Sequence, residues 1–121
     1  MPCLTGFSSF ASLPEERISD KVSRRVVSGN QGMVVWWSIE AGVHVETHQH
    51  PSEQIVWMLE GKMEFRIGDE RHMCGPGDIL VIPAGVEHEC WFREDTQVID
   101  IFSPPREDFL AGGKPAYMNE T

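Results

Sequence analysis

Short segments rich in β-branched and aromatic residues recur along most of the chain, and this pattern limits the fold more than any other feature. Six such segments span residues 22–28, 32–40, 54–60, 62–68, 78–83 and 96–102. Glycine, proline and aspartate separate them, as in GNQG, GDE, GPGD and PAG. Segments of this length and spacing predict strands joined by tight turns. We therefore expect an all-β fold, a sandwich or barrel of antiparallel strands.

The two ends of the chain depart from this pattern. Ser12 in SLPEERI precedes Pro14, Glu15 and Glu16, which is a weak signal for the start of a helical turn. The stretch SPPREDFLAGGKPAYMNET, from residue 103 onward, contains paired prolines and paired glycines. It predicts an irregular arm that lies over the barrel, rather than a further strand.

Length allows one hydrophobic core, and no segment has the character of a long linker. The 121 residues are therefore expected to form a single domain. We place the barrel core at about residues 22–103, with an N-terminal arm at 1–21 and a C-terminal arm at 104–121.

The charge balance excludes some classes of partner. Asp and Glu number 19 against 10 Lys and Arg, which gives a formal net charge of −9. Nucleic acid and anionic membranes are poor partners for such a chain. The N-terminal stretch lacks a basic and apolar leader, so a cytoplasmic protein is expected. Cys3, Cys74 and Cys90 are irregularly spaced and are expected to be free thiols.

The stretch HQHPSEQ, residues 48–54, carries the clearest chemical signal. Side chains alternate between the two faces of a strand, so His48, His50 and Gln54 share one face and Glu53 lies on the other. A third histidine, His88, follows the turn residues of PAG. Imidazoles together with an amide oxygen suit a divalent first-row metal.

Two further histidines are not included in this candidate site. His44 has the same alternation as His48, but it falls in no recognisable ligand pattern. His72, in DERHMCG, is expected to be an ordinary exposed residue.

Asp100 and Arg106 are the other candidate site residues. Asp100 interrupts the apolar segment TQVIDIF, where an unpaired carboxylate costs several kcal/mol unless it gains a partner or its pKa shifts. Alternation places it with Phe102 toward the barrel interior, although an ion pair with one of the arginines of SRRVV, Arg24 or Arg25, is an alternative. Arg106 follows two prolines and suits a substrate carboxylate. The alternative is a surface arginine paired with Glu107 or Asp108.

Two longer stretches resemble the paired motifs of the cupins. GVHVETHQHPSEQIVWMLEG, residues 42–61, has the first motif's spacing of Gly, HxH, Glu or Gln, and Gly. GDILVIPAGVEH, residues 77–88, has the second motif's spacing of Gly, PxG and His. The resemblance implies a double-stranded β-helix, a jelly-roll-like barrel of two antiparallel sheets. It also assigns one divalent transition metal, Ni, Fe, Mn, Zn, Co or Cu, to His48, His50, Gln54 and His88. Phe92 stands where the second motif often has an Asn that is not a ligand.

Within the cupins, RRVV, HPSEQIVWMLEGKMEF, GPGDILVIPAGVEH and VIDIFSPPREDFL resemble the small KdgF-type proteins, which convert 4,5-unsaturated monouronates into linear keto forms. The resemblance implies a pocket lined by Asp100, Phe102 and Arg106. Asp100 and Arg106 would be catalytic, and Phe102 and Arg106 would bind substrate. Ser52 stands where that group often has His, which weakens the assignment of substrate without affecting the ligands.

The expected function is therefore that of a metal-dependent enzyme, an isomerase of uronate metabolism acting on a small carboxylated sugar or keto acid. The alternatives are a metal-dependent dioxygenase or lyase acting on a small keto acid or diketone, and a non-catalytic small-molecule-binding protein. Small cupins often form homodimers, and we expect one here. Trp36, Trp37 and Trp57 leave at least one indole on an outward face, unless all three fill the gap between the sheets.

Overall fold

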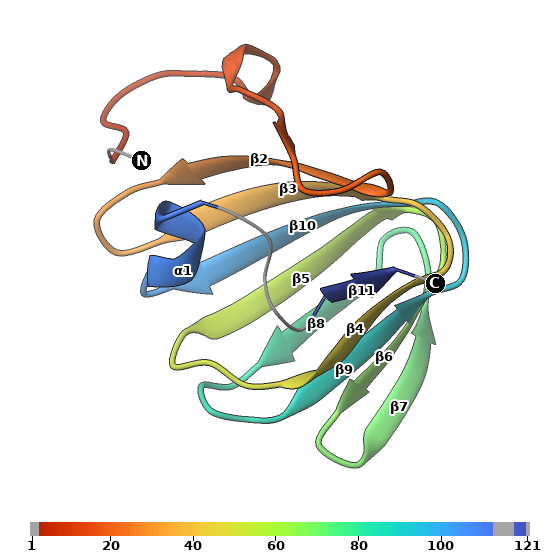
Figure 1. The fold of residues 1–121 in the computed structure, drawn as a ribbon. Helices are drawn as coiled ribbons and strands as arrows, with labels where there is room; N and C mark the ends of the chain where they lie inside the picture. Colours follow the sequence, from red (N-terminus) through yellow and green to blue (C-terminus); the bar gives the residue numbers. More distant parts are fainter. Residues whose placement is uncertain (1–2, 113–117, 121) are drawn as a thin grey trace.

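The computed structural model describes residues 3–112 and 118–120, and it consists of two antiparallel sheets rolled into a barrel (Figure 1). One sheet has the order β1-β2-β3-β10-β5-β8 and the other the order β11-β4-β9-β6-β7. The first comprises β1 (Glu16–Arg17), β2 (Val22–Ser28), β3 (Met33–Ile39), β10 (Thr96–Ser103), β5 (Glu53–Glu60) and β8 (Ile79–Ile82). The second comprises β11 (Met118–Glu120), β4 (Val43–His48), β9 (His88–Phe92), β6 (Met63–Ile67) and β7 (Glu70–Cys74). The expected all-β fold of two antiparallel sheets is confirmed.

The core lies between the inner faces of the two sheets. In strand β3 every second side chain points into this core, and these residues are buried: Met33, Val35, Trp37 and Ile39. Strand β10 contributes Val98 and Phe102 to the core, and strand β6 contributes Met63 and Phe65. Each apolar side chain of this size stabilises the fold by about 1.5–3 kcal/mol when it is fully buried.

The prediction that a helical turn begins at Ser12 is wrong. Ser12 ends a single 3-10 turn, η1 (Phe10–Ser12), and the Glu15 and Glu16 segment is extended. Glu16 pairs with Arg24 in the register of β1 on β2, and its carboxylate lies 3.0 Å from the buried Arg24 guanidinium. Backbone pairing with the edge of β2, together with this ion pair, therefore overrides the weak local signal.

The prediction of an irregular C-terminal arm without a further strand is also wrong, for two segments. Residues Glu107–Leu110 form a short helix, α1, which lies beyond the end of β10 (Figure 1). Its Phe109 is buried against Trp37 and Phe102, with ring centroids 5.8 and 5.5 Å away. Residues 118–120 form β11, which pairs with β4. Both elements depend on tertiary contacts that a local sequence pattern does not contain.

Within the described residues, no helix has the length and apolar character needed to cross a membrane.

Candidate metal centre

Three histidines meet at one point inside the barrel. The candidate ligand nitrogens of His48, His50 and His88 all lie within 4.8 Å of one another. His48 ends β4 and His88 begins β9, and the two residues face each other directly in the pairing of these strands. His50 lies in the segment between β4 and β5, with its ring centroid 4.8 Å from that of His88. Strand pairing thus joins positions that are 40 residues apart in the sequence.

The two candidates for a fourth ligand, Gln54 and Glu53, lie on opposite faces, as the alternation predicted. The chain between β4 and β5, residues 49–52, is not a strand, yet the alternation of burial continues through it. His50, Ser52 and Gln54 are buried, whereas Glu53 is exposed. The amide oxygen of Gln54 lies 3.0 Å from Nε2 of His50.

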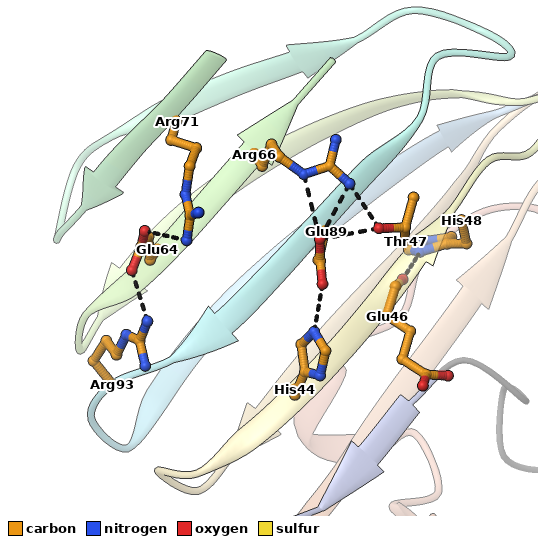
Figure 2. A network of polar contacts seen from close by, with 9 residues as sticks. All are labelled: His44, Glu46, Thr47, His48, Glu64, Arg66, Arg71, Glu89 and Arg93. Carbon is orange, nitrogen blue, oxygen red and sulfur yellow. Dashed lines mark hydrogen bonds and ion pairs between the residues drawn. The ribbon is translucent and has the colours of Figure 1, made fainter. Parts of the chain in front are cut away.

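His44 lies outside this cluster because the register shifts between Val45 and His48 in the pairing of β4 with β9. Val45 faces the core, so His44 faces outward even though its number has the same parity as His48. Its Nε2 lies 2.6 Å from Glu89, which also contacts Arg66 (Figure 2). The other excluded histidine, His72, is exposed beside Glu70, as expected.

The three clustered rings share one hydrogen-bonding arrangement. In each, Nδ1 lies close to a backbone carbonyl oxygen two residues away: 2.8 Å for His48 to Glu46, 2.8 Å for His50 to Ser52 and 2.9 Å for His88 to Val86. Figure 2 shows the first of these bonds. A carbonyl oxygen only accepts, so Nδ1 carries the proton and Nε2 of the neutral ring carries a lone pair. This is the tautomer that binds a metal through Nε2.

Electrostatics keep the three rings neutral. Burial lowers the pKa of His48 to about 4 and that of His88 to about 3, and the positive charge of Arg106 contributes to both shifts. Burial and Arg106 also lower the pKa of His50. At neutral pH the lone pairs are therefore available to a cation rather than occupied by protons.

Two features of the site fit a bound cation. Nε2 of His88 is buried and has no hydrogen-bond partner among the residues that the structure describes, although buried polar atoms are rarely left in this state. Nε2 of His50 faces the oxygen of Gln54 at 3.0 Å, so two lone-pair atoms confront each other. A cation between these atoms would satisfy all of them. Three imidazole nitrogens and an amide oxygen match the preference of divalent first-row metals.

Asp100 lines an inner chamber together with His48 and His88. Nε1 of Trp37 donates to its Oδ2 at 3.0 Å, and hydrogen bonding from the Gln54 side chain lowers the pKa of the same carboxylate. Asp100 is half-buried in this chamber, and burial raises its pKa to about 6 although hydrogen bonding from Gln54 and Trp37 lowers it. The arginines proposed as alternative partners pair elsewhere, Arg24 with Glu16 and Arg25 with Glu15. No sequence signal pointed to Trp37 as a partner of Asp100.

Arg106 pairs with Asp108, as its alternative interpretation expected, but it is buried rather than a surface residue. It precedes α1 and binds Asp108 through two contacts, Nε to Oδ1 at 3.1 Å and Nη2 to Oδ2 at 2.6 Å. It is nevertheless only 7% exposed and lines the same cavity as Asp100. Its guanidinium lies 4.1 Å from the ring centroid of Phe109 and 5.3 Å from that of Phe102. The Asp108 contact and the two rings together fix its position.

The site has two compartments. An inner chamber of about 50 Å³ has mostly apolar walls, and its polar lining residues are His48, Gln54, His88, Asp100 and Arg106. An outer groove of about 690 Å³ is lined by residues that include His50, Ser52, Pro104 and Arg106. The Ser52 hydroxyl donates to the carbonyl of Pro104 at 2.6 Å, which ties the two sides of the groove together. The chamber is the size of an ion with its water, whereas the groove admits a small organic molecule.

Comparisons with known proteins agree with this geometry. The cupin domain model matches residues 35–102. The pectin degradation protein KdgF of Dickeya dadantii is 29% identical over 100 residues, which cover 80% of this chain and 91% of that protein. The structure of KdgF from Halomonas sp. superposes with a TM-score of 0.78 at 27% identity, covering 88% of this chain and 99% of that one. The dimethylsulfoniopropionate lyase DddQ of Ruegeria pomeroyi is 41% identical over 49 residues, which are 40% of this chain and 24% of that protein.

Proposed function

This chain belongs to the cupin domain family, and on that premise we propose that it is a metal-dependent isomerase that ketonises a 4,5-unsaturated uronate. One observation carries the proposal: two of the three clustered histidines, a carboxylate and a buried guanidinium line one chamber, and the third histidine lines a groove that shares this guanidinium. The similarity to KdgF of Dickeya dadantii over 80% of the chain supports the substrate class.

The metal would be held by His48, His50, Gln54 and His88. Their neutral rings and amide leave the full charge of a divalent ion in place, and such an ion supplies Lewis acidity toward anionic oxygens. Imidazole and amide ligands accept nickel, iron, manganese, zinc, cobalt and copper alike.

Arg106 would bind the substrate's carboxylate at the boundary between groove and chamber. Its fixed guanidinium is suited to planar recognition of a carboxylate, and a buried position strengthens that bond. Phe102, which is buried beside His50 and Arg106, would present its ring to the sugar. Together they would orient the unsaturated end of the molecule toward Asp100.

Asp100 would move the proton. Ketonisation removes a proton from an enol oxygen and adds one at carbon, so the composition of the substrate does not change. A group with a pKa of about 6 exchanges protons readily near neutral pH. Asp100 lines the same chamber as His48, His88 and Arg106, which supports this role.

The test uses the wild-type protein loaded in turn with each of the six metals. We expect loss of the ultraviolet absorbance of the conjugated alkene when a 4,5-unsaturated monouronate is added. Unchanged absorbance with every metal would remove this substrate class. The partial similarity to the lyase DddQ supports a lyase as the second candidate, and it is tested by consumption of dimethylsulfoniopropionate in the same preparations. Oxygen uptake with a keto acid would indicate a dioxygenase.

The protein is also proposed to form a homodimer through the outer face of β5 and β8. Trp57 on β5 is 46% exposed, and Ile79 and Val81 on β8 are 67% and 53% exposed. Trp57 lies opposite Ile79 in the pairing of the two strands, and β8 is an edge strand. The other two candidate indoles differ, since Trp37 is buried in the core and Trp36 packs against Phe10. Exposed apolar side chains along an uncharged edge strand are typical of an interface.

A further inference from the structure

We propose that Asp100 fixes the orientation of the Gln54 side-chain amide, and so determines which end of that amide faces the three histidines. The inference rests on the metal site of the proposed function, but it is independent of the substrate. It makes Asp100 a positioning residue for a ligand, in addition to any role in proton transfer.

The strand pairing brings the two side chains together. Gln54 lies opposite Phe102 in the pairing of β5 with β10, so Asp100, two residues before Phe102, is its diagonal neighbour on the same inner face. Both side chains line the inner chamber, and hydrogen bonding from the Gln54 side chain lowers the pKa of the Asp100 carboxylate, which is the effect of a donor.

The two ends of the Gln54 amide are not equivalent. The NH2 group only donates and the oxygen only accepts, whereas an ionised carboxylate only accepts. Asp100 can therefore bind the NH2 end alone, which leaves the oxygen directed toward Nε2 of His50 at 3.0 Å. In the reverse orientation two acceptors would meet at Asp100, and the NH2 group would occupy the position of a metal ligand.

His50 by itself would favour that reverse orientation. Its Nδ1 donates to Ser52, so Nε2 is an acceptor that would bind the NH2 end of Gln54. The oxygen faces it instead. The preference of His50 is therefore overridden, and Asp100 is the neighbour whose chemistry requires this result.

Trp37 supports the same arrangement from the other side. Its Nε1 donates to Oδ2 of Asp100 at 3.0 Å, and an indole N–H has no acceptor mode. Asparagine at position 100 would offer one oxygen and one NH2 group to two donors. Trp37 cannot reverse its role but Gln54 can, so the amide of Gln54 is the group that turns.

The first experiment measures the affinity of metal-free protein for cobalt(II), by visible absorption in competition with a chelator. We expect Asp100→Asn to weaken binding by about tenfold or more, the scale on which residues that orient metal ligands act. The matched control is Asp69→Asn, which removes the same charge at an exposed position and should bind cobalt like the wild type. Trp37→Phe keeps the carboxylate and should weaken binding much less than Asp100→Asn does.

The decisive experiment is a double-mutant cycle with Gln54→Glu. A carboxylate at position 54 accepts at both oxygens, so it can bind the NH2 group of an asparagine at position 100 and still direct an oxygen at the metal. We expect Asp100→Asn to weaken cobalt binding when residue 54 is Gln, and to leave it unchanged or strengthen it when residue 54 is Glu. Equal weakening in both backgrounds would overturn the inference.

Circular dichroism of each metal-free variant guards against loss of the fold. If Asp100→Asn alone unfolds the protein, the double variant should restore both the fold and cobalt binding, because its donors and acceptors are matched again. Failure to restore them would overturn the inference. A wild type that binds no cobalt would overturn this inference together with the proposed metal site. If the double-mutant cycle is non-additive but the wild-type protein does not ketonise uronates, the inference stands and the proposed activity is wrong.

Discussion

Asp100 serves two purposes in the proposed site, and both depend on its being a carboxylate. As an acceptor it holds the Trp37 and Gln54 donors, and as a group with a pKa of about 6 it can move a proton. A simple Asp100→Asn variant changes both properties at once. The two roles separate only when the metal ligand set is kept constant.

The proton role can be tested in the Gln54→Glu background. There the ligand oxygens do not depend on Asp100, so Gln54→Glu and the double variant with Asp100→Asn should hold the same metal content. We expect turnover of the unsaturated uronate to be about 100-fold or more lower in the double variant, the usual contribution of a general acid or base. The measurement is the initial rate at saturating substrate, with metal content determined on the same samples. Equal turnover in the two variants would remove Asp100 from proton transfer.

How far single residues can be predicted from sequence is clear from Asp100 and its neighbours. A charged residue in an apolar strand is visible in the sequence, and alternation gives the face it occupies. Its partners are not visible, because Trp37 and Gln54 become neighbours only through the order β3-β10-β5. Strand order is set by the whole barrel rather than by any local pattern.

At the scale of elements, each of the six expected segments contains a strand: β2, β3, β5, β6, β8 or β10. Segments 22–28, 54–60 and 96–102 match β2, β5 and β10 closely, because each carries its own apolar alternation. The six expected segments did not include β4, β7 and β9, nor the short elements β1, β11 and α1. Strands β4 and β9 lie inside the second sheet, whereas β1, β7 and β11 lie at sheet edges. The short elements signal little in their own residues, and their partners decide their conformation. The irregularity in β4 likewise reversed the face of His44, which number parity alone does not reveal.

The turn between β5 and β6 gives a prediction at this scale. Gly61 has a φ of +96°, and a Cβ there would lie 2.4 Å from the backbone oxygen of Asp95. Gly61→Ala therefore adds a steric clash to an unfavourable backbone conformation, and we expect a loss of about 2 kcal/mol or more in the free energy of unfolding. Chemical denaturation followed by tryptophan fluorescence provides the measurement.

Gly68 offers the matched control for this prediction. Its φ is +56° and a Cβ there would meet nothing within 4 Å, so Gly68→Ala introduces conformational strain without a clash. It should cost less than Gly61→Ala. Equal losses for the two variants would show that contact with Asp95 does not determine the need for glycine at position 61.

At the scale of the whole molecule, the polar chemistry and the exposed apolar surface lie on different sides of the first sheet. Asp100 and Gln54 point from β10 and β5 into the inner chamber, whereas Trp57 and Ile79 are exposed. Odd and even positions of β5 therefore serve different purposes, because successive side chains point to opposite faces. A contact on the outer face would leave the entrance to the chamber open.

The proposed homodimer is tested at this outer face. Ile79→Lys places a charge on the edge strand at its most exposed apolar residue, where it opposes both apolar contact and strand pairing. We expect sedimentation equilibrium to give a dimer for the wild type and 13.7 kDa for this variant. Because each chain carries a net charge of −9, added salt should strengthen the wild-type dimer by screening repulsion between its copies.

The control for this interface is Met73→Lys. Met73 is 53% exposed on β7 of the other sheet, so this variant should leave the dimer intact. A monomeric wild type, or an Ile79→Lys variant that stays dimeric, would refute this interface.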